Sequence, residues 1–329
     1  MNDTIACSRE RQFDIDVTVL VVNYNTGFLL DRMFSALEAA KADLKVQVIV
    51  VDNASRDDSV EILRSRYPNV ELVENLVNVG FGRANNQALP GVKGRYVLLL
   101  NTDAFVSPNT LVKTTNFMDA NRQFGILGVK LVGEDGFLQP SCRYFPTPWT
   151  VFLRSTGFAR FFPRARLVDD LTWDHASVRT CDWVPGCYYL IRREVIERVG
   201  LFDPRYFLYF EEVDHCREVQ KAGWKVVYFP FTQVIHLGGE SAKSVTDLTS
   251  SGRQISLLQI ESQLLYFRKQ HGLPGVVGSI FLSILADLTI AMKRLIQYRG
   301  MHRALPHLKQ AWFTIRLFFE TNLASRSTR

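Results

Sequence analysis

The sequence VTVLVVN at residues 17–23 decides the fold class, because a run of β-branched residues without polar alternation is typical of a strand buried on both faces. VQVIVVD at residues 46–52 and YVLLLN at residues 96–101 have the same character. Segments with helical periodicity alternate with these runs, at residues 28–40, 57–67, 81–89 and 108–120. This alternation predicts an α/β fold with a mostly parallel sheet and helices on both faces.

The second half of the chain is less regular. Residues 133–182 are rich in Gly, Pro, Arg and aromatic residues and predict no clear elements. The segments that follow predict strands at residues 184–191 and 225–228, helices at 192–199 and 211–222, and helices at 255–269, 276–298 and 304–317 with a break at 272–275. We therefore predict three parts: a polar tail (1–16), an α/β domain (17–245) and a helical C-terminal region (246–329).

The composition narrows the class of protein. With 329 residues, 47% of them apolar, the chain is long enough for one large α/β domain and an appendage, and its net charge of +6 is only mildly basic. Five scattered cysteines without a CxxC pair argue against a disulfide framework or a zinc site and indicate a reducing compartment. The first sixteen residues lack the apolar core of a secretory signal, and no uninterrupted apolar run of 18 residues predicts a transmembrane helix.

Polar residues follow three of the predicted strands. In an open parallel sheet, ligands bind beyond the carboxyl ends of the strands. The residues at those ends are Asn23 and Asn25, Asp52 and Asn53, and Asn101 and Asp103. Asn and Asp are also common turn residues, but three such clusters on one rim predict a binding site, in which Asp52 can accept hydrogen bonds from a pyrimidine base or a ribose.

Two short motifs concern phosphate and metal binding. A nicotinamide-binding fold would need a Gly-rich turn after its first strand, whereas NYNTG at residues 23–27 has one glycine and GFGRAN at 80–85 lacks the third. Asn101-Thr102-Asp103 is an NxD variant of a DxD motif. Two oxygen-bearing side chains at a strand end suit Mg²⁺ or Mn²⁺, which take few protein ligands together with phosphate oxygens.

The sequence FLYFEEVDHCRE at residues 207–218 places Glu211, Glu212 and Asp214 at the start of a helix, after an aromatic stretch that we predict as a strand. An acidic first turn can simply compensate the helix dipole, at about 0.3–1 kcal/mol. Alternatively, one carboxylate is a general base shielded from water by its aromatic neighbours. His236, predicted to follow the last strand, is either structural or a ligand beside Gly238 and Gly239, where backbone can approach a phosphate.

Taken in order, seven motifs resemble those of the family 2 glycosyltransferases, and most closely their bacterial rhamnosyltransferase branch. They are VTVLVVNYN, VIVVDNASRDDS, NVGFGRANNQAL, YVLLLNTDAFV, PGCYYLIRR, GLFDPRYFLYFEEVDHCRE and VIHLGGES. The resemblance covers residues 17–241. It implies a GT-A fold (a Rossmann-like, mostly parallel sheet flanked by helices), a nucleotide-sugar donor and inversion at the anomeric carbon.

The resemblance also implies roles for individual residues. The expected nucleotide-sugar site consists of Asn23, Asn25, Asp52, Asn53, Asn78, Gly80, Phe81, Asn85, Asn86 and Asn101. Asp103 and His236 are the expected ligands of a divalent metal, Mg²⁺ or Mn²⁺. Glu212 aligns with the catalytic base and Glu211 lies beside it, but relatives often have Asp at position 212, so the choice between the two stays open.

Gly186 and Asp214 are the remaining residues of the expected site, and the resemblance places both on the acceptor side.

The apolar segment at residues 276–292 (VVGSIFLSILADLTIAM) has two interpretations. Basic residues interleaved with aromatics follow it: Lys293, Arg294, Arg299, Arg303, Lys309 and Arg316. The helix either packs on the catalytic domain or lies in a membrane interface. There, attraction to anionic lipid would contribute about 1 kcal/mol of binding free energy per basic residue. The resemblance favours the anchor, because such rhamnosyltransferases resemble enzymes that extend polyprenyl-diphosphate-linked saccharides.

The sequence thus leads us to expect an inverting rhamnosyltransferase that uses dTDP-rhamnose. We expect it in the cytoplasm, peripheral at the inner face of the cytoplasmic membrane, acting in cell-surface polysaccharide synthesis without a nucleic-acid partner. The same fold could take a UDP-hexose or UDP-galactofuranose instead. A nucleotidyltransferase would need a Gly-rich phosphate loop that NYNTG lacks, and a non-catalytic sugar-binding protein would not be expected to keep Asp52, Asp103, Glu211 and Glu212.

Overall fold

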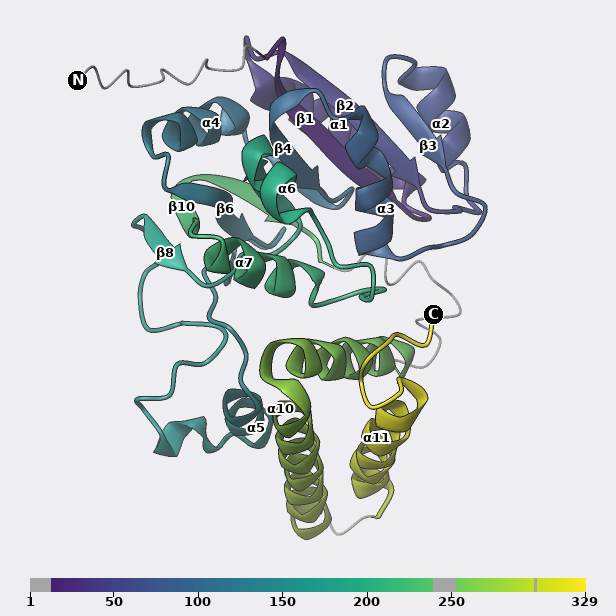
Figure 1. The fold of residues 1–329 in the computed structure, drawn as a ribbon, viewed down its shortest axis with the longest axis vertical. Coiled ribbons are helices and arrows are strands. Elements are labelled where there is room, and N and C mark those ends of the chain that lie inside the picture. The colour runs from purple at the N-terminus through teal and green to yellow at the C-terminus, as the bar shows by residue number, and fades with distance from the viewer. Residues whose placement is uncertain (1–12, 239–252, 299–300) are drawn as a thin grey trace, which may run out of the picture.

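A single ten-stranded sheet forms the centre of the computed structural model, which describes residues 13–238, 253–298 and 301–329 (Figure 1). The strands are β1 (Ile15–Asn23), β2 (Val46–Asp52), β3 (Glu71–Glu74), β4 (Gly94–Leu100), β5 (Ala104–Val106), β6 (Phe124–Val132), β7 (Leu138–Gln139), β8 (Arg179–Cys181), β9 (Tyr188–Arg192) and β10 (Lys225–His236). Their order is β3-β2-β1-β4-β9-β6-β10-β5, with β7 paired to β6 and β8 to β10.

Helices cover both faces of this sheet, as the alternation of elements predicts. The helices are α1 (Gly27–Lys41), α2 (Ser59–Arg66), α3 (Phe81–Ala88), α4 (Thr110–Ala120), α5 (Pro148–Thr156), α6 (Arg193–Val199), α7 (Glu211–Lys221), α10 (Arg253–Tyr298) and α11 (Met301–Glu320), with short 3₁₀ turns η1 (Leu89–Gly91) and η2 (Phe158–Phe161). Leu98 and Leu100 of β4 join the core under α1, α2 and α4. Val97 and Leu99 join the core under α3, α6 and α7, so both faces of the central strand are buried.

The sheet is mixed at its centre rather than parallel throughout. β1 runs parallel to both β2 and β4, but β9 lies between β4 and β6 and is antiparallel to each. The strand predicted at residues 184–191 is present, but it starts at Tyr188. The chain turns just before this residue and enters the sheet from the opposite end, so the earlier residues are not part of the strand.

Two sequence predictions around the site are wrong. The aromatic stretch before α7 is a loop and not a strand, because Tyr209 and Phe210 have left-handed φ angles of 71° and 69° that no strand accommodates. His236 is the last residue of β10 and does not follow the final strand. A register shift between Phe229 and Gln233 lets β10 bend past Pro230 and continue along β6.

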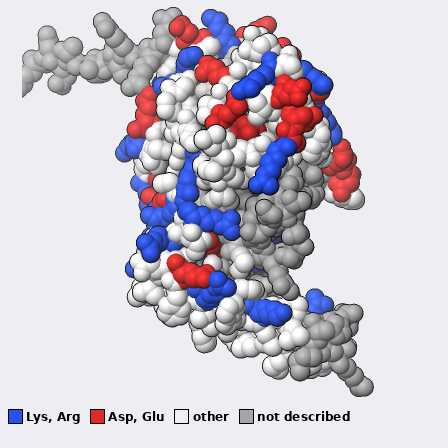
Figure 2. All heavy atoms as spheres, turned by 90° about the vertical axis from the view of Figure 1, so that its right-hand side faces the viewer, with Lys and Arg blue, Asp and Glu red and all other residues white. Residues whose placement is uncertain are grey.

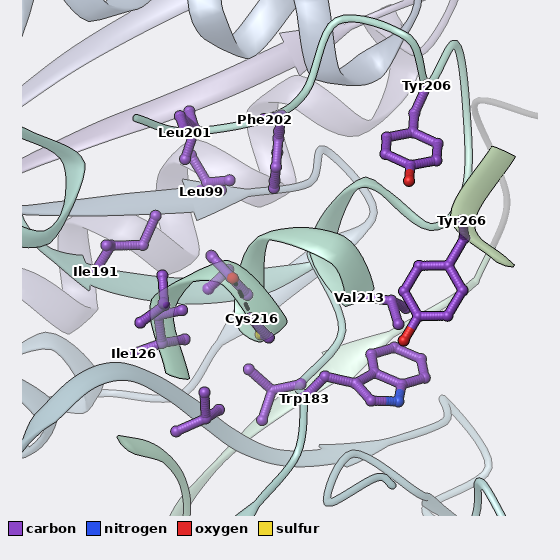
Figure 3. Packing of buried hydrophobic residues seen from close by; sticks show 14 of the residues in the cluster. Leu99, Ile126, Trp183, Ile191, Leu201, Phe202, Tyr206, Val213, Cys216 and Tyr266 are labelled. Carbon is purple, nitrogen blue, oxygen red and sulfur yellow. Dashed lines mark hydrogen bonds between the residues drawn. The ribbon is translucent and has the colours of Figure 1, made fainter. Parts of the chain in front are cut away.

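The C-terminal helices form a hairpin that projects away from the sheet domain (Figure 1). The predicted break is present, since Gly272 within α10 has φ 68° and ψ −167°. Before the break, α10 packs against the sheet domain, and Figure 3 shows Tyr266 of α10, Val213 of α7 and Trp183 pointing toward one another there. α11 starts at Met301, earlier than the predicted 304.

The predicted division into three parts stays a prediction. The tail predicted at 1–16 falls mostly outside the described residues, and β1 already begins at Ile15. The boundary at 245–246, together with Gly239, also lies outside them. The region that the sequence left unassigned carries α5 and η2, and α5 packs beside α10 (Figure 1).

Candidate active site

The structure brings the ends of β1, β2 and β4 together. β1 and β2 pair in a register that sets Asn23 opposite Asp52, and the Asn23 amide Nδ2 donates to Asp52 Oδ2 at 2.8 Å. The backbone N–H of Ser55 donates to Asp52 Oδ1 at 2.9 Å. Thr26 Oγ1 donates to Asn23 Oδ1 at 2.8 Å and lies 2.9 Å from Thr102 Oγ1, after β4. A carboxylate has about four acceptor positions, so Asp52 keeps capacity for a ligand on both oxygens.

A network of side-chain amides fixes the loop before α3. Asn53 Nδ2 donates to Asn78 Oδ1 at 2.8 Å, and the same oxygen accepts from the N–H of Gly80 at 2.9 Å. Asn53 Oδ1 accepts from Asn75 Nδ2 at 3.1 Å and from the N–H of Val79 at 3.0 Å. Asn53 and Asn78 therefore act together, holding this loop against the end of β2.

The start of α3 is docked on the loop that precedes α7. The N–H of Phe81 donates to the carbonyl of Phe207 at 2.9 Å. Gly80 has φ +89°, and a Cβ placed there would lie 2.3 Å from that carbonyl oxygen, so only glycine fits. Asn86 exchanges two hydrogen bonds with the backbone of Phe202, at 2.7 and 3.1 Å. The loop and helix predicted to bind the nucleotide sugar are thus hydrogen-bonded directly to the loop that leads to Glu211 and Glu212.

Two further asparagines of the expected site stabilise local backbone. Asn25 adopts φ 51°, and its Oδ1 accepts from the N–H of Arg56 at 2.6 Å. Asn85 is buried, and its Nδ2 donates to the carbonyl of Phe81 at 3.0 Å. Both amides thus contribute to the shape of the rim through the backbone around them.

Asp103 and His236 lie side by side because β5 and β10 pair antiparallel, with Ala104 opposite His236. His236 Nε2 is 3.6 Å from Asp103 Oδ1. Gln139 on β7 holds the histidine from the other side: its Nε2 donates to the His236 carbonyl at 2.8 Å, and its Oε1 lies 2.9 Å from Nδ1. Since that amide oxygen only accepts, Nδ1 carries the proton and Nε2 presents a lone pair toward Asp103.

The chemistry of this pair fits a divalent cation. Burial lowers the pKa of His236, which favours the neutral imidazole needed in a metal ligand. Asn101 precedes Asp103 in a turn closed by a hydrogen bond from the N–H of Ala104 to the Asn101 carbonyl at 3.1 Å. In the part of the chain that the structure describes, no group of three or more His, Cys, Asp or Glu side chains forms a metal site. A two-ligand site suits Mg²⁺ or Mn²⁺ bound together with substrate phosphates.

Glu211 and Glu212 begin α7 with carboxylates turned into the protein. The Oε2 atom of each is buried and has no hydrogen-bond partner among the described residues. Burial raises the pKa of Glu211 well above its usual value, and the charge of Glu212 raises it further. Burial also raises the pKa of Glu212, but backbone N–H groups of α7 and the charge of Arg143 oppose that rise. Both pKa shifts are upward, so the pair holds a proton more readily than an exposed glutamate would.

The two residues expected on the acceptor side differ in placement. Gly186 lies beside α3, where an added Cβ would be 3.5 Å from Cε1 of Phe81. Asp214 is directed to α10 and is not brought to the site: its Oδ2 pairs with Lys269 Nζ at 2.5 Å, and its Oδ1 accepts from Gln270 Nε2 at 2.6 Å. The sequence-based placement of Asp214 missed this because its partners are on a helix more than fifty residues away.

Comparison with known proteins gives consistent matches. The family model described as glycosyl transferase family 2 matches residues 18–177. The chain is 30% identical over 231 residues to the N-acetylglucosaminyl-diphospho-decaprenol L-rhamnosyltransferase of Mycobacterium tuberculosis, covering 66% of this chain and 75% of that protein. It is 25% identical over 238 residues to rhamnosyltransferase WbbL of Escherichia coli, covering 69% and 86%.

Solved structures confirm the predicted GT-A architecture. The mannosyltransferase PcManGT of Pyrobaculum calidifontis, in complex with GDP-Man and Mn²⁺, superposes with a TM-score of 0.53 at 16% identity, covering 95% of this chain and 91% of that one. A TarS fragment from S. aureus gives a TM-score of 0.50 at 14% identity, covering 94% and 92%. At these identities the likeness concerns the fold alone.

Proposed function

The chain belongs to glycosyl transferase family 2, in its rhamnosyltransferase-like branch, and on that premise we propose that it transfers rhamnose from dTDP-rhamnose to a saccharide carried on a lipid diphosphate. The observation that carries this proposal is the match to the Mycobacterium tuberculosis enzyme, whose name gives both the sugar and a diphospho-decaprenol acceptor. The product would extend a cell-surface polysaccharide. The acidic pair of α7 and the pair of Asp103 and His236 supply the groups that such a transfer needs.

In the proposed reaction, Glu212 takes the proton of the acceptor hydroxyl. The acceptor oxygen forms a bond to the anomeric carbon from the face opposite the diphosphate, the bond to the diphosphate oxygen breaks, and the configuration inverts. In this proposal Glu211 holds a proton while Glu212 is ionised, since two adjacent buried carboxylates do not readily ionise together. General-base assistance of this kind contributes about 10²–10⁴ in rate.

Asp103 and His236 would hold Mg²⁺ or Mn²⁺, which when bound neutralises charge on the donor diphosphate. Gln139 keeps the imidazole in the tautomer that this requires. On the other side of the rim, Asp52 would accept hydrogen bonds from the nucleotide base or ribose, and the loop fixed by Asn53 and Asn78 would lie beside the nucleotide sugar. Asn101 and Gly186 complete this proposed site.

The proposed function is tested by transfer assays on the purified protein. We expect release of dTDP from dTDP-rhamnose in the presence of Mn²⁺ and an alkyl-diphospho-N-acetylglucosamine acceptor, followed by mass spectrometry of the disaccharide. If the protein turns over only UDP-glucose or UDP-galactofuranose and not dTDP-rhamnose, it is a transferase of the same fold that uses a different donor. Formation of a nucleotide sugar from a nucleoside triphosphate would indicate a nucleotidyltransferase, and binding without turnover would contradict an enzymatic role.

We further propose that the hairpin of α10 and α11 lies on a membrane surface. One helical segment of the described chain, Leu257–Gln297, is long and apolar enough to cross a membrane, and an 18-residue stretch within it has a mean hydropathy of 1.9. Large apolar side chains are exposed on both helices and on the neighbouring α5–η2 segment: Val277, Phe281, Leu285, Leu288, Met292, Ile296, Leu308, Trp312, Ile315, Phe319, Trp149, Phe161 and Phe162. In Figure 2 the lower part of the molecule is mostly white with some blue and little red, whereas the sheet domain mixes red and blue throughout.

Charge and geometry favour a peripheral arrangement over a span. α10 breaks at Gly272, and its first part is buried against α7 and the sheet domain. Asp287 is buried in the apolar part of α10, with an oxygen 3.6 Å from Nδ1 of His307 on α11. A helical hairpin with a polar pair between its helices and apolar residues on its outer surface is suited to the boundary between lipid and water.

Placing acidic residues on the hairpin is expected to release the protein from membranes. Val276 is fully buried, so truncation there would uncover the core, and substitution of exposed residues is the cleaner test. We expect Phe281→Glu with Ile296→Glu to abolish flotation with phosphatidylglycerol vesicles, because each change replaces an apolar contact with charge repulsion. Phe28→Glu is the matched control, since Phe28 is 68% exposed and Phe281 is 64% exposed. Equal flotation of all variants would show that the hairpin does not bind lipid.

A further inference from the structure

Arg143 occupies a fixed position at the edge of the site, although nothing in its local sequence distinguishes it. Its N–H donates to the Trp183 carbonyl at 3.2 Å, and its own carbonyl accepts from the N–H groups of Asp182 and Trp183 at 2.9 and 3.2 Å. The backbone is therefore held on both sides, where the segment that carries α5 leaves the sheet domain and returns to it.

The guanidinium of Arg143 is sheltered but keeps hydrogen-bonding capacity. It lies 4.8 Å from the centroid of the Trp183 ring, and its side chain is 27% exposed. Its Nε is buried and forms an ion pair with Asp169 Oδ1 at 2.8 Å, so this nitrogen is not accessible to a ligand and any binding must use the terminal Nη groups. A planar, permanently charged group held by stacking is suited to binding an oxyanion through those groups.

The position of Trp183 brings Arg143 near the acidic pair. Trp183, over whose ring the guanidinium lies, packs in one cluster with Val213, the residue after Glu212 on α7 (Figure 3). The charge of Arg143 also lowers the pKa of Glu212, against the larger effect of burial, which raises it. The guanidinium therefore lies within electrostatic reach of the proposed base.

The charge of the proposed site requires a cation near the substrate. The proposed site contains three acidic residues, Asp103, Glu211 and Glu212, and it must accept a diphosphate, which carries further negative charge. Resting on the proposed function, we propose that Arg143 is a substrate-binding residue that holds a phosphate oxygen of a diphosphate in the active site. Two diphosphates meet there, that of the nucleotide donor and that of the lipid-linked acceptor, and a guanidinium binds either by the same forked hydrogen bonds.

The test compares Arg143 with a second arginine in a similar setting. Arg179 on β8 lies 4.7 Å from the Trp173 ring and pairs with Asp170 at 3.2 Å, so it makes the same two kinds of contact with a different tryptophan and a different carboxylate. The variants are Arg143→Gln, Arg143→Lys, Asp169→Asn and the control Arg179→Gln. Asp169→Asn removes the ion pair but leaves the guanidinium in place, so it separates a structural role from a binding role.

Two measurements distinguish the donor from the acceptor. The Kd of dTDP in the presence of Mn²⁺ is measured by calorimetry. KM is measured for an alkyl-diphospho-N-acetylglucosamine and for the matching alkyl N-acetylglucosamine that lacks the diphosphate. We expect Arg143→Gln to raise the dTDP Kd about tenfold if the donor is bound, or to raise KM about tenfold for the diphosphate acceptor alone if the acceptor is bound. Arg143→Lys is expected to raise the same constant by about threefold, because lysine keeps the charge but not the forked geometry.

Asp169→Asn and Arg179→Gln are expected to stay within about twofold of wild type in every measurement. Unchanged constants in both measurements for Arg143→Gln would overturn the inference, as would an equal loss in Asp169→Asn. Should Arg143→Gln fail to fold, unchanged constants in Arg143→Lys would overturn it instead. A wild-type protein that neither binds dTDP nor uses either acceptor would contradict the proposed function itself.

Discussion

Glu212→Gln is expected to lower kcat by about two orders of magnitude or more while leaving the Kd of the donor nearly unchanged. Glutamine keeps the size of the side chain but cannot accept the proton of the acceptor hydroxyl. Because Oε2 of Glu212 is buried without a partner, the substitution removes no hydrogen bond of that atom in the described structure. Single-turnover rates and donor titration by calorimetry measure the two quantities separately.

Glu211→Gln is the matched control for this prediction. Burial and the neighbouring charge favour the neutral form of Glu211, and glutamine reproduces a neutral side chain of the same size. We expect kcat to stay within about tenfold of wild type, with the larger effect on acceptor KM. A severe loss of turnover in Glu211→Gln together with near-normal turnover in Glu212→Gln would transfer the role of base to Glu211. Normal turnover in both would leave the pair with a helix-stabilising role only.

The pH dependence of kcat provides an independent check. Burial raises the pKa of Glu212 above the ordinary glutamate value of about 4.3. The base is active when ionised, so activity is present at high pH and is lost as pH falls through this raised pKa. The acid limb of the profile is therefore expected above the value for an exposed glutamate and to be absent from the residual activity of Glu212→Gln.

Asp103→Asn is expected to lower turnover by about a thousandfold or more, because charge stabilisation by a bound metal is worth several kcal/mol. The amide preserves shape next to His236 but removes the negative charge that would hold the cation. Mn²⁺ affinity, measured by calorimetry in the presence of dTDP, is expected to fall in parallel. Full activity of wild type in excess EDTA, or unchanged Mn²⁺ affinity of the variant, would refute the metal role.

Gln139→Leu gives a graded comparison in the same assay. It leaves both proposed ligands in place but removes the amide that keeps the proton on Nδ1 of His236. Loss of a residue that orients a metal ligand typically costs about 10–100-fold in metal affinity or activity, so this variant is expected to fall between wild type and Asp103→Asn.

The strands and helices of the first half could be predicted because their signals are local. Fully buried strands such as β1, β2 and β4 are continuous apolar runs, and their carboxyl ends necessarily meet at one rim. The prediction of a strand before α7 failed because Tyr and Phe favour strands on average, whereas the left-handed angles at Tyr209 and Phe210 depend on the packing of the loop against Tyr24 and Leu258.

The parts of the site that escaped prediction depend on distant contacts. Gln139 and His236 are 97 positions apart and meet only because β7 and β10 both pair with β6. Arg143 lies in the region that predicted no elements, and its role depends on Trp183 and on charges from other segments. Local patterns in the sequence contain no signal for such pairs.

The central position of β9 has a consequence for biosynthesis. Until residues 188–192 have left the ribosome, β4 keeps one unpaired edge, and β6 lacks both β9 and the later strand β10. Val97, Leu99 and Ile126, all buried in the finished protein, belong to these incompletely paired strands. Open apolar strand edges invite pairing with other chains. Nascent or truncated chains that stop short of β9 are therefore expected to aggregate or to need a chaperone, and this late-arriving strand ties the two halves of the sheet into one cooperative folding unit.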